Sequence, residues 1–285
     1  MKKVDVIINV YGKPWQTLCT LKSLEKKSGE YIDKIFLIKE KEQPYNENID
    51  WIFDKLNNVE VYTPNLYSFT SHNVNYNSEN ERFKIRYQYG FERSDKKFIF
   101  ITHNDVLYCG DIISDMLSKI GDSIGIGEIG QCWNCPAKSN GLCSGEKFYE
   151  WNPNYEDILK FKLPHVRTRI EDINKKNPKP MPECRLNEWS CLINRESSNK
   201  ETFPNGNTPF FGQYGIDLGV PWFKSLHNKG YTFVDYRKNF IHTYWSTTSG
   251  YPTQLNKELY DISENNAKEY FEKNFNYDYN NILHT

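Results

Sequence analysis

The chain has 285 residues and a mass of 33.8 kDa, enough for one large α/β domain or for one domain with an appended subdomain. Its 36 Lys and Arg balance 37 Asp and Glu, giving a formal net charge of -1, which excludes a global basic field that recruits nucleic acid or anionic membrane. The N-terminus lacks a signal peptide's apolar region, and no apolar run reaches the ~20 residues of a spanning helix. With seven cysteines we therefore expect a cytosolic protein, with membrane contact at most peripheral.

The first part of the chain alternates predicted strands with predicted helices. The β-branched run Val4–Val10 is typical of a strand buried on both faces. An amphipathic helix follows, with Pro14 at its first turn and Gly29 at its end. Further strands are expected at 34–38 and 59–62, around a helix at 50–56. This alternation predicts an α/β fold with a doubly wound, mostly parallel sheet flanked by helices.

The strongest central strand is expected at 97–102. Its carboxyl end delivers His103, Asn104 and Asp105 to the edge of the sheet where ligands of open α/β folds bind. Residues 63–80 are predicted to form a loop, and 81–93 a helix that carries Arg82 and Arg86 on one face. A helix at 111–120 and a strand at 123–129 follow.

Four cysteines lie in or beside a segment from Gly130 to about Thr208 that has little periodicity. Cys132 and Cys135 form a Cys-x2-Cys pair, Cys143 follows eight residues later, and Cys184 is distant. This spacing predicts a structural Zn2+ held by four thiolates, which would supply the constraint that this irregular segment lacks. Ordinary buried thiols and a disulfide pair stay open as alternatives.

Regular structure is expected to return in the last part of the chain. A helix is predicted over Tyr214–Lys229, with Pro221 as an awkward interior residue, followed by a strand at 231–234. A polar helix is predicted over Asn256–Asn274. Because no repeat or linker divides the chain, we expect a single domain.

The ordered segments Val6–Gly12, Arg86–Gly90 and Phe98–Asp105 resemble the nucleotide-sugar half of GT-A glycosyltransferases, most closely the inverting family 2. The resemblance covers roughly residues 4–130, with a looser echo from Gly212 to Trp245. It implies a GT-A-like sheet, with a donor-binding half at 1–130 and an acceptor-side half at 131–285 that carries the Cys-rich insertion. It also implies transfer of a sugar, with inversion, from a nucleotide diphosphate sugar to a saccharide or lipid-linked saccharide acceptor, in the assembly of a surface polysaccharide or glycolipid.

The resemblance also implies a divalent cation. In such enzymes a strand ends in an Asp-x-Asp-type motif whose last carboxylate holds a cation on the donor diphosphate. Here Asp105 occupies that position and His103 replaces the first acidic residue, so Asp105 is the predicted ligand of Mn2+ or Mg2+, which neutralises the leaving group. His242 follows the last strand, where the family supplies a third ligand. A turn-forming Asp and a structural His are the alternatives.

The resemblance further places the nucleotide beside the first loop, Asn9–Gly12, and the second strand. Tyr11 is expected to pack on the base, with a core aromatic as the alternative, and Glu40 to lie near the base or ribose. Arg82 and Arg86 are candidates for the diphosphate, because a guanidinium suits phosphate, while a solvated helix face is the alternative. The predicted nucleotide-binding residues are Asn9, Tyr11, Gly12, Glu40, Arg86 and Asn104.

An inverting transfer needs a carboxylate that deprotonates the acceptor hydroxyl. The family keeps this base at the start of a helix in the second half, which identifies Asp217 as the first candidate and a helix-capping Asp as the alternative. Glu188, beside the aromatic Trp189, is the second candidate. Trp222 and Trp245 are considered for a sugar-stacking wall, with core packing as the alternative.

Two other classes of function remain open. A nucleotidyltransferase also uses an α/β sheet and a metal-binding Asp, but it usually has a Gly-rich basic phosphate loop, of which Tyr11–Pro14 is a poor version. A zinc-stabilised binding module for nucleic acid or protein is the non-enzymatic alternative. The neutral net charge argues against nucleic acid.

Overall fold

The computed structural model describes residues 3–65, 74–130, 135–160, 173–246 and 255–275. Within these ranges a seven-stranded sheet has the order β3-β2-β1-β4-β7-β6-β8. Only β7 runs against the others, because it pairs antiparallel with both β4 and β6, whereas the remaining pairings are parallel. The predicted α/β fold with a mostly parallel sheet is therefore confirmed. The strands are β1 Val4–Val10, β2 Ile32–Lys39, β3 Val59–Tyr62, β4 Phe98–Thr102, β6 Gly125–Ile129, β7 Leu186–Asn194 and β8 Phe233–Asp235.

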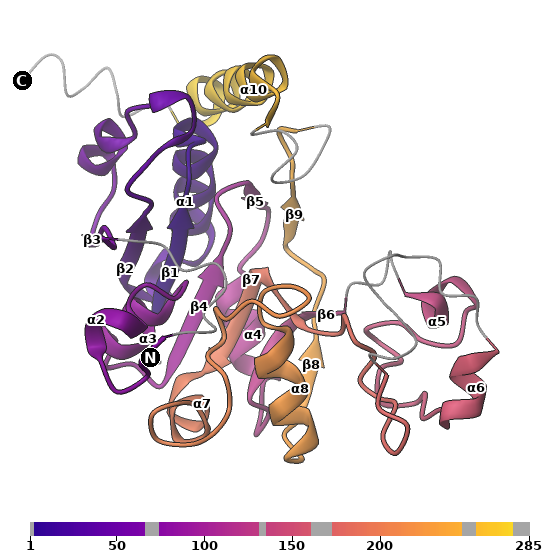
Figure 1. Ribbon diagram of the computed structural model, residues 1–285. Coiled ribbons are helices and arrows are strands. Elements are labelled where there is room, and N and C mark those ends of the chain that lie inside the picture. Colours follow the sequence, from indigo (N-terminus) through magenta and orange to yellow (C-terminus); the bar gives the residue numbers. More distant parts are fainter. Residues whose placement is uncertain (1–2, 66–73, 131–134, 161–172, 247–254, 276–285) are drawn as a thin grey trace, which may run out of the picture.

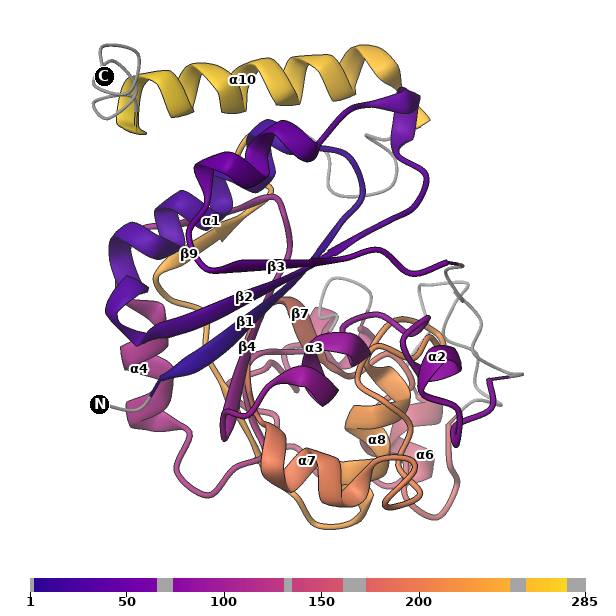
Figure 2. The same cartoon turned by 90° about the vertical axis from the view of Figure 1, so that its left-hand side faces the viewer.

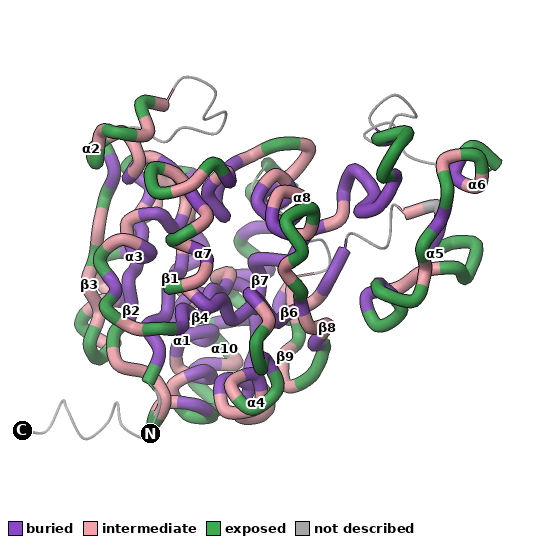
Figure 3. Tube along the Cα trace, turned by 90° about the horizontal axis from the view of Figure 1, so that it is seen from below, coloured by how far each residue is buried: buried purple, intermediate pink, exposed green. Residues whose placement is uncertain are grey.

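Helices cover both faces of this sheet (Figure 2). Because successive side chains of a strand point to opposite faces, Val6 and Ile8 of β1 join one apolar cluster with α1 (Pro14–Ser28) and α4 (Ile112–Lys119). Ile7 joins another cluster with α3 (Gln88–Arg93) and α8 (Val220–Asn228). The central strands β1, β4 and β7 are accordingly buried along almost their whole length (Figure 3).

Strand β7 lies in the segment from Gly130 to about Thr208, where the sequence has little periodicity and no strand was predicted. It is buried along its whole length although it carries Asn187, Glu188 and Ser190. The amide of Asn187 donates to the carbonyl oxygens of Glu128 and Gly130, both at 2.9 Å. A strand whose polar side chains are paired inside the protein has no alternating pattern, so periodicity alone cannot detect it. Helix α7 (Arg195–Glu201) follows directly.

Three predicted helices have different bounds from those expected. The helix expected at 81–93 is two short helices, α2 (Glu79–Arg82) and α3, because Tyr87 between them has a φ of 66°. Pro221 is not an interior residue, since α8 begins at Val220 and Pro221 lies in its first turn, where proline is tolerated. Residues 50–56 form the 3-10 helix η3 (Asp50–Lys55). Two further 3-10 helices are η1 (Gly29–Tyr31) and η2 (Pro44–Asn46).

Three further parts complete the described chain (Figure 1). A small antiparallel sheet pairs β5 (Val106–Tyr108) with β9 (Phe240–His242), and α10 (Lys257–Phe275) packs on α1 through Leu18, Cys19, Ala267 and Phe271. A lobe with α5 (Pro136–Ser139) and α6 (Tyr155–Leu159) extends to one side. None of the helices in the described ranges has both the length and the apolar character needed to cross a bilayer.

Candidate active site

The candidate active site lies where β1 and β4 end and where the antiparallel β7 begins. Thr102 of β4 pairs with Ser190 of β7, and the backbone N–H of His103 donates to the carbonyl oxygen of Trp189 at 3.2 Å. The reversed direction of β7 therefore brings its first residues, including Glu188, to the carboxyl end of β4. This edge is where open α/β sheets bind their ligands.

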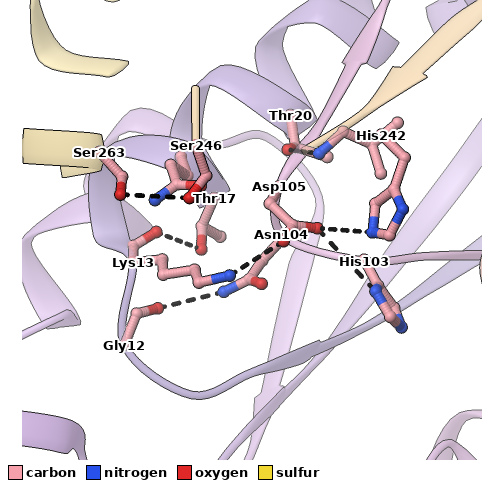
Figure 4. A network of polar contacts seen from close by, with 12 residues as sticks. Gly12, Lys13, Thr17, Thr20, His103, Asn104, Asp105, His242, Ser246 and Ser263 are labelled. Carbon is pink, nitrogen blue, oxygen red and sulfur yellow. Dashed lines mark hydrogen bonds and ion pairs between the residues drawn. The ribbon is translucent and has the colours of Figure 1, made fainter. Parts of the chain in front are cut away.

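Asp105 is the centre of the site (Figure 4). Its carboxylate is 3% exposed, and its Oδ2 lies 2.9 Å from the Nζ of Lys13. Its Oδ1 faces two imidazoles, with His242 Nε2 at 3.4 Å and His103 Nδ1 at 3.9 Å. One carboxylate oxygen is thus taken by an ammonium group, while the other points to a pair of histidines.

Backbone pairing explains why His242 arrives here from a distant part of the chain. Val106 of β5 pairs with His242 of β9, and the N–H of Thr243 donates to the carbonyl oxygen of Asp105 at 2.9 Å. The ring of Trp189 stacks on the His242 imidazole, with centroids 4.7 Å apart and an angle of 19°. These contacts fix the orientation of the imidazole relative to Asp105.

The donor atoms of His103, Asp105 and His242 all lie within 4.8 Å of one another, so that they could bind one metal ion. Burial by itself raises the pKa of Asp105, but the Lys13 ammonium and then His242 hold that pKa well below its usual range. Asp105 is therefore ionised at neutral pH. A charged oxygen beside two imidazole nitrogens is a suitable ligand set for a divalent transition metal.

Both predicted bases lie on the other side of His103, joined through Arg185. His103 Nε2 is 3.4 Å from Glu188 Oε1, and Arg185 Nη1 is 2.9 Å from Glu188 Oε2. The same Nη1 lies 3.2 Å from Asp217 Oδ1. The structure thus brings Asp105, Glu188 and Asp217 into one continuous network of charged groups.

The two carboxylates differ in exposure. Glu188 is 5% exposed, whereas the Asp217 side chain is 19% exposed. Burial raises the pKa of Glu188, but Arg185 and then His103 outweigh burial and lower it to about 2. A carboxylate with such a low pKa accepts protons poorly, so Asp217 is the better candidate for a base. Asp217 precedes α8 without capping it, since the N-cap of that helix is Gly219.

Three of the predicted nucleotide-binding residues form a second polar group at the ends of β1 and β2. The amide of Asn9 donates to Glu40 Oε1 at 3.4 Å. Burial raises the pKa of Glu40 to about 7, although the nearby Arg86 and the hydrogen bond from Asn9 oppose this shift. The three residues Asn9, Glu40 and Arg86 therefore lie near one another. Residues that bind the same nucleotide would have to do so.

Replacing Glu40 with Gln is expected to remove a pH dependence of stability. Because the pKa of Glu40 is raised on folding from 4.5 to about 7, the folded state holds a proton that the unfolded chain releases. The wild type therefore loses stability as pH rises from about 5 to 8, by up to about 3 kcal/mol. Urea unfolding at both pH values should show a smaller loss in Glu40→Gln. The exposed Glu42→Gln is the control, and an equal loss in the wild type and Glu40→Gln would contradict the prediction.

The first loop is held against the turn that carries Asp105. The amide of Asn104 donates to the carbonyl oxygen of Gly12 at 3.2 Å, while Tyr11 is half-buried beside it. Gly12 has a φ of 63°, and an added Cβ would lie 2.4 Å from Pro44 Cγ and 2.7 Å from Tyr260 Oη. Only glycine fits this position.

Other predicted contacts are not at the site. Arg82 makes two hydrogen bonds of 2.6 Å to the carboxylate of Glu92, so its charge is used within the α2–α3 region. Trp222, a residue of α8, is fully buried, and Trp245 is 4% exposed and packs between α1 and α10. The structure therefore agrees with core packing, the alternative to a sugar-stacking wall, for both tryptophans.

Three of the four predicted zinc ligands lie near one another in the lobe, and Cys132 lies outside the described residues. Cys135 and Cys184 pack against the same small cluster of Ile158, Ile173 and Met181. Cys143 and Cys184 both interact electrostatically with Lys179. Cys184 directly precedes Arg185, which connects the lobe to the candidate active site.

Two residues of the candidate active site, Lys13 and Arg185, were not predicted from the amino-acid sequence. Lys13 appeared only as part of a poor phosphate loop, and Arg185 lay in a segment without periodicity. Both side chains are almost completely buried, at 2% and 4% exposed. The position of Lys13 immediately after the Gly of the first loop could have identified it. No feature of the sequence indicated Arg185.

No protein-family model matches the chain, and no curated protein matches it in sequence. Similar solved structures include the mannosyltransferase PcManGT from Pyrobaculum calidifontis in complex with GDP-Man and Mn2+, at 9% identity, 84% coverage of this chain, 56% of that chain and a TM-score of 0.48. Glucosyl-3-phosphoglycerate synthase from Mycobacterium tuberculosis, in complex with Mn2+, UDP-glucose and phosphoglyceric acid, is 9% identical, with 94% and 80% coverage and a TM-score of 0.45. The galactosyltransferase LgtC, in complex with donor and acceptor sugar analogs, is 13% identical, with 70% and 60% coverage and a TM-score of 0.38.

The chain spans between about half and two thirds of the length of two of these proteins, 56% of the mannosyltransferase and 60% of LgtC. The similarity to these three structures concerns the path of the backbone, since at most 13% of the aligned residues are identical. The fold assignment rests on the strand order, and the chemistry of the site rests on its own side chains.

Proposed function

We propose that the protein is a metal-dependent glycosyltransferase that moves a sugar from a nucleotide diphosphate sugar to an acceptor hydroxyl. The observation that carries this proposal is the group of Asp105, His103 and His242 at the carboxyl edge of the sheet. A group of possible cation ligands around a buried carboxylate at this edge suits a substrate whose leaving group is a diphosphate. The order of segments that resembles GT-A enzymes supports the same assignment.

The residues present fit a divalent cation. Asp105 is ionised, its Oδ1 faces two imidazole nitrogens, and Lys13 holds its Oδ2. Two nitrogen donors favour Mn2+ over Mg2+, which prefers oxygen ligands. When bound, the ion would neutralise negative charge that develops on the departing nucleotide diphosphate.

For the donor, we assign the nucleotide to the polar group of Asn9, Glu40 and Arg86, together with Tyr11, Gly12 and Asn104. These residues belong to the segment 1–130, which we propose as the donor-binding half of the domain. The Asn9 amide and the Glu40 carboxyl supply a donor and an acceptor side by side, the combination that reads the edge of a base or the hydroxyls of a ribose. Arg86 would face the phosphates.

For the transfer step, we assign the base to Asp217. In a single inverting displacement, Asp217 takes the proton of the acceptor hydroxyl while that oxygen bonds to the anomeric carbon, and the bond from this carbon to the diphosphate oxygen breaks. Asp217 is partly exposed and belongs to the segment 131–285, which we propose as the acceptor-side half. Arg185 orients its carboxylate. A saccharide or lipid-linked saccharide, of the kind used in surface polysaccharide or glycolipid assembly, is the acceptor we propose.

Melting temperatures measured with nucleotide sugars test this proposal. Uridine, guanosine and cytidine diphosphate sugars are added one at a time, with and without Mn2+. We expect one of the three to raise the melting temperature only when Mn2+ is present, because a ligand that binds only the native state stabilises it, by about 2.7 kcal/mol at a hundredfold excess over the dissociation constant. No shift with any of them, together with no transfer or hydrolysis, would exclude the function.

We further propose that the lobe binds a structural Zn2+ through Cys132, Cys135, Cys143 and Cys184. The packing of Cys135 and Cys184 on one small apolar cluster supports this assignment, because a cluster of this size cannot stabilise the lobe alone.

Removing a ligand should release the metal. Cys184→Ser is expected to lose Zn2+, measured by elemental analysis, and to lower the melting temperature, because metal binding contributes folding free energy. Cys19→Ser, in the buried contact between α1 and α10, is the matched control and should keep its zinc. Wild-type protein purified without added chelator but free of zinc would refute this site.

A further inference from the structure

Helix α10 crosses the beginning of α1, the helix that follows the first loop (Figures 1 and 2). Lys13 occupies the N-cap position of α1 but makes no side-chain cap, since its ammonium group is a donor and is paired with Asp105. Helix N-termini leave free N–H groups that need acceptors, usually supplied by Ser, Thr, Asp or Asn at the N-cap. The acceptor for α1 must therefore come from elsewhere.

Glu264 of α10 supplies this acceptor. Its Oε2 accepts the N–H of Trp15 at 2.8 Å, and its Oε1 accepts the side-chain amide of Gln16 at 3.0 Å and the Gln16 N–H at 3.4 Å. Glu264 is 6% exposed. A carboxylate is also favourable at the positive end of the helix dipole. Helix α10 thus caps α1 in place of Lys13, which leaves the lysine available to Asp105.

Tyr260, one helical turn before Glu264, holds the backbone of Lys13 itself. Its hydroxyl accepts the Lys13 N–H at 2.7 Å and donates to the carboxylate of Glu47. Lys13 has a φ of 57°, a left-handed conformation that is unfavourable for a non-glycine residue and persists only when its surroundings enforce it. The hydroxyl of Tyr260 also closes the space beside Gly12. The conformation of the first loop is therefore imposed from α10.

We infer that Tyr260 and Glu264 are positioning residues of the candidate active site, acting through Lys13. They set the Lys13 ammonium 2.9 Å from Asp105 Oδ2, which turns Oδ1 toward His103 and His242. The cation-binding geometry at the end of β4 thus depends on a helix near the end of the described chain. The consequence for metal affinity rests on the proposed function, whereas the position of Lys13 does not.

Chemical labelling of Lys13 tests the inference without any metal. Acetic anhydride is added to the whole protein at pH 8, and the acetylation rate of each lysine is measured by mass spectrometry. Lys13 should be protected in the wild type, because it is 2% exposed and ion-paired. In Tyr260→Phe, which lacks the acceptor for the Lys13 N–H, we expect labelling of Lys13 to rise about tenfold, with Lys22 and Lys26 of the same helix unchanged.

Matched variants on α10 distinguish a specific effect on the position of Lys13 from a general weakening of the packing of α10. Tyr270→Phe and the exposed Glu269→Gln do not touch the first loop and should leave Lys13 protected, whereas Glu264→Gln should expose it. Protection of Lys13 in both Tyr260→Phe and Glu264→Gln would overturn the inference, as would equal exposure in the control variants or a reactive Lys13 in the wild type.

The affinity for Mn2+, measured by titration calorimetry, is the second readout. Tyr260→Phe should bind Mn2+ about tenfold more weakly, and Tyr270→Phe should bind it as the wild type does. Unchanged affinity in a variant with an exposed Lys13 would overturn the link from Lys13 to the cation site. A wild type that binds no Mn2+ would contradict the proposed function, while the labelling would still decide whether α10 positions Lys13.

Discussion

Asp105→Asn is expected to abolish sugar transfer, by about a thousandfold or more, and to eliminate measurable binding of Mn2+. Asp105 is the only carboxylate in the described cation-binding group, so its replacement removes the negative charge that attracts the ion. A Lewis acid on a diphosphate supplies several kcal/mol of transition-state stabilisation, and about 4 kcal/mol corresponds to a thousandfold in rate. Transfer from the donor identified by thermal shift, and calorimetric titration with Mn2+, are the two measurements.

Asp217→Asn is the matched control for this result. Asp217 is also paired with a buried cation, Arg185, but it is not among the residues that could hold the metal. Its replacement should lower the turnover number and leave Mn2+ binding intact. Asp105→Asn also leaves the buried Lys13 without its partner, so circular dichroism must show that the variant is folded at the assay temperature. A folded Asp105→Asn that transfers sugar at the wild-type rate would eliminate the proposed role of Asp105.

Lys13→Met is expected to destabilise the protein by about 3–5 kcal/mol, the usual cost of removing one partner of a buried ion pair. Lys13 and Asp105 are each 3% exposed in their side chains and lie 2.9 Å apart. Burial penalises the charge of Asp105, and Lys13 is the leading group that offsets this penalty. The variant therefore keeps a buried carboxylate without its principal counter-ion. Urea unfolding monitored by tryptophan fluorescence gives the change in free energy.

The double variant Lys13→Met with Asp105→Asn distinguishes the ion pair from lost packing. If the charges are coupled, the double variant is less destabilised than the sum of the two single variants, by about 1–3 kcal/mol. Lys22→Met is the comparison on the surface of the same helix, where the pair with Glu25 is 23% and 37% exposed and contributes at most about 1 kcal/mol. Additive effects of Lys13→Met and Asp105→Asn would show that the pair is not energetically coupled.

The pairing of Lys13 also bears on the alternative of a nucleotidyltransferase. In a phosphate-binding loop the lysine reaches toward the phosphates of the nucleotide. Here the ammonium is buried against Asp105, and the loop has only one glycine. The structure therefore favours a role for Lys13 in organising the carboxylate over a role in binding phosphate directly.

Much of the sheet could be predicted because its strands are apolar. Val4–Val10 and Phe98–Thr102 are buried on both faces, so that a continuous apolar run in the sequence maps directly onto a central strand. The end of the second of these strands identified His103 and Asp105 as candidates, since the direction of a parallel strand determines which end meets the ligand. Asn9, Glu40 and Arg86, which the resemblance suggested for the nucleotide, lie near one another. The roles assigned to these residues stay predictions.

Strand β7, and the residues that it brings to the candidate active site, could be identified only from the tertiary structure. Glu188 and Asn187 are polar yet buried, because Arg185 and the backbone of the neighbouring strand pair with them, and such compensation between distant segments leaves no local pattern. Arg185 reaches the site through the antiparallel direction of β7, and His242 reaches it through the three residue pairs that join β9 to β5. The predicted helix at 81–93 was wrong for a related reason, because the left-handed conformation of Tyr87, which separates α2 from α3, is set by its surroundings.

By itself, the amino-acid sequence determined the alternating α/β architecture and the position of Asp105 at the end of a central strand, because both follow from local apolar runs and strand direction. The tertiary structure decided the partners of Asp105. Lys13, His103 and His242 meet it from three strand ends, and α10 holds the loop that carries Lys13. Buried charges are stable only when partners from several segments converge on them, and that convergence is a property of the folded chain.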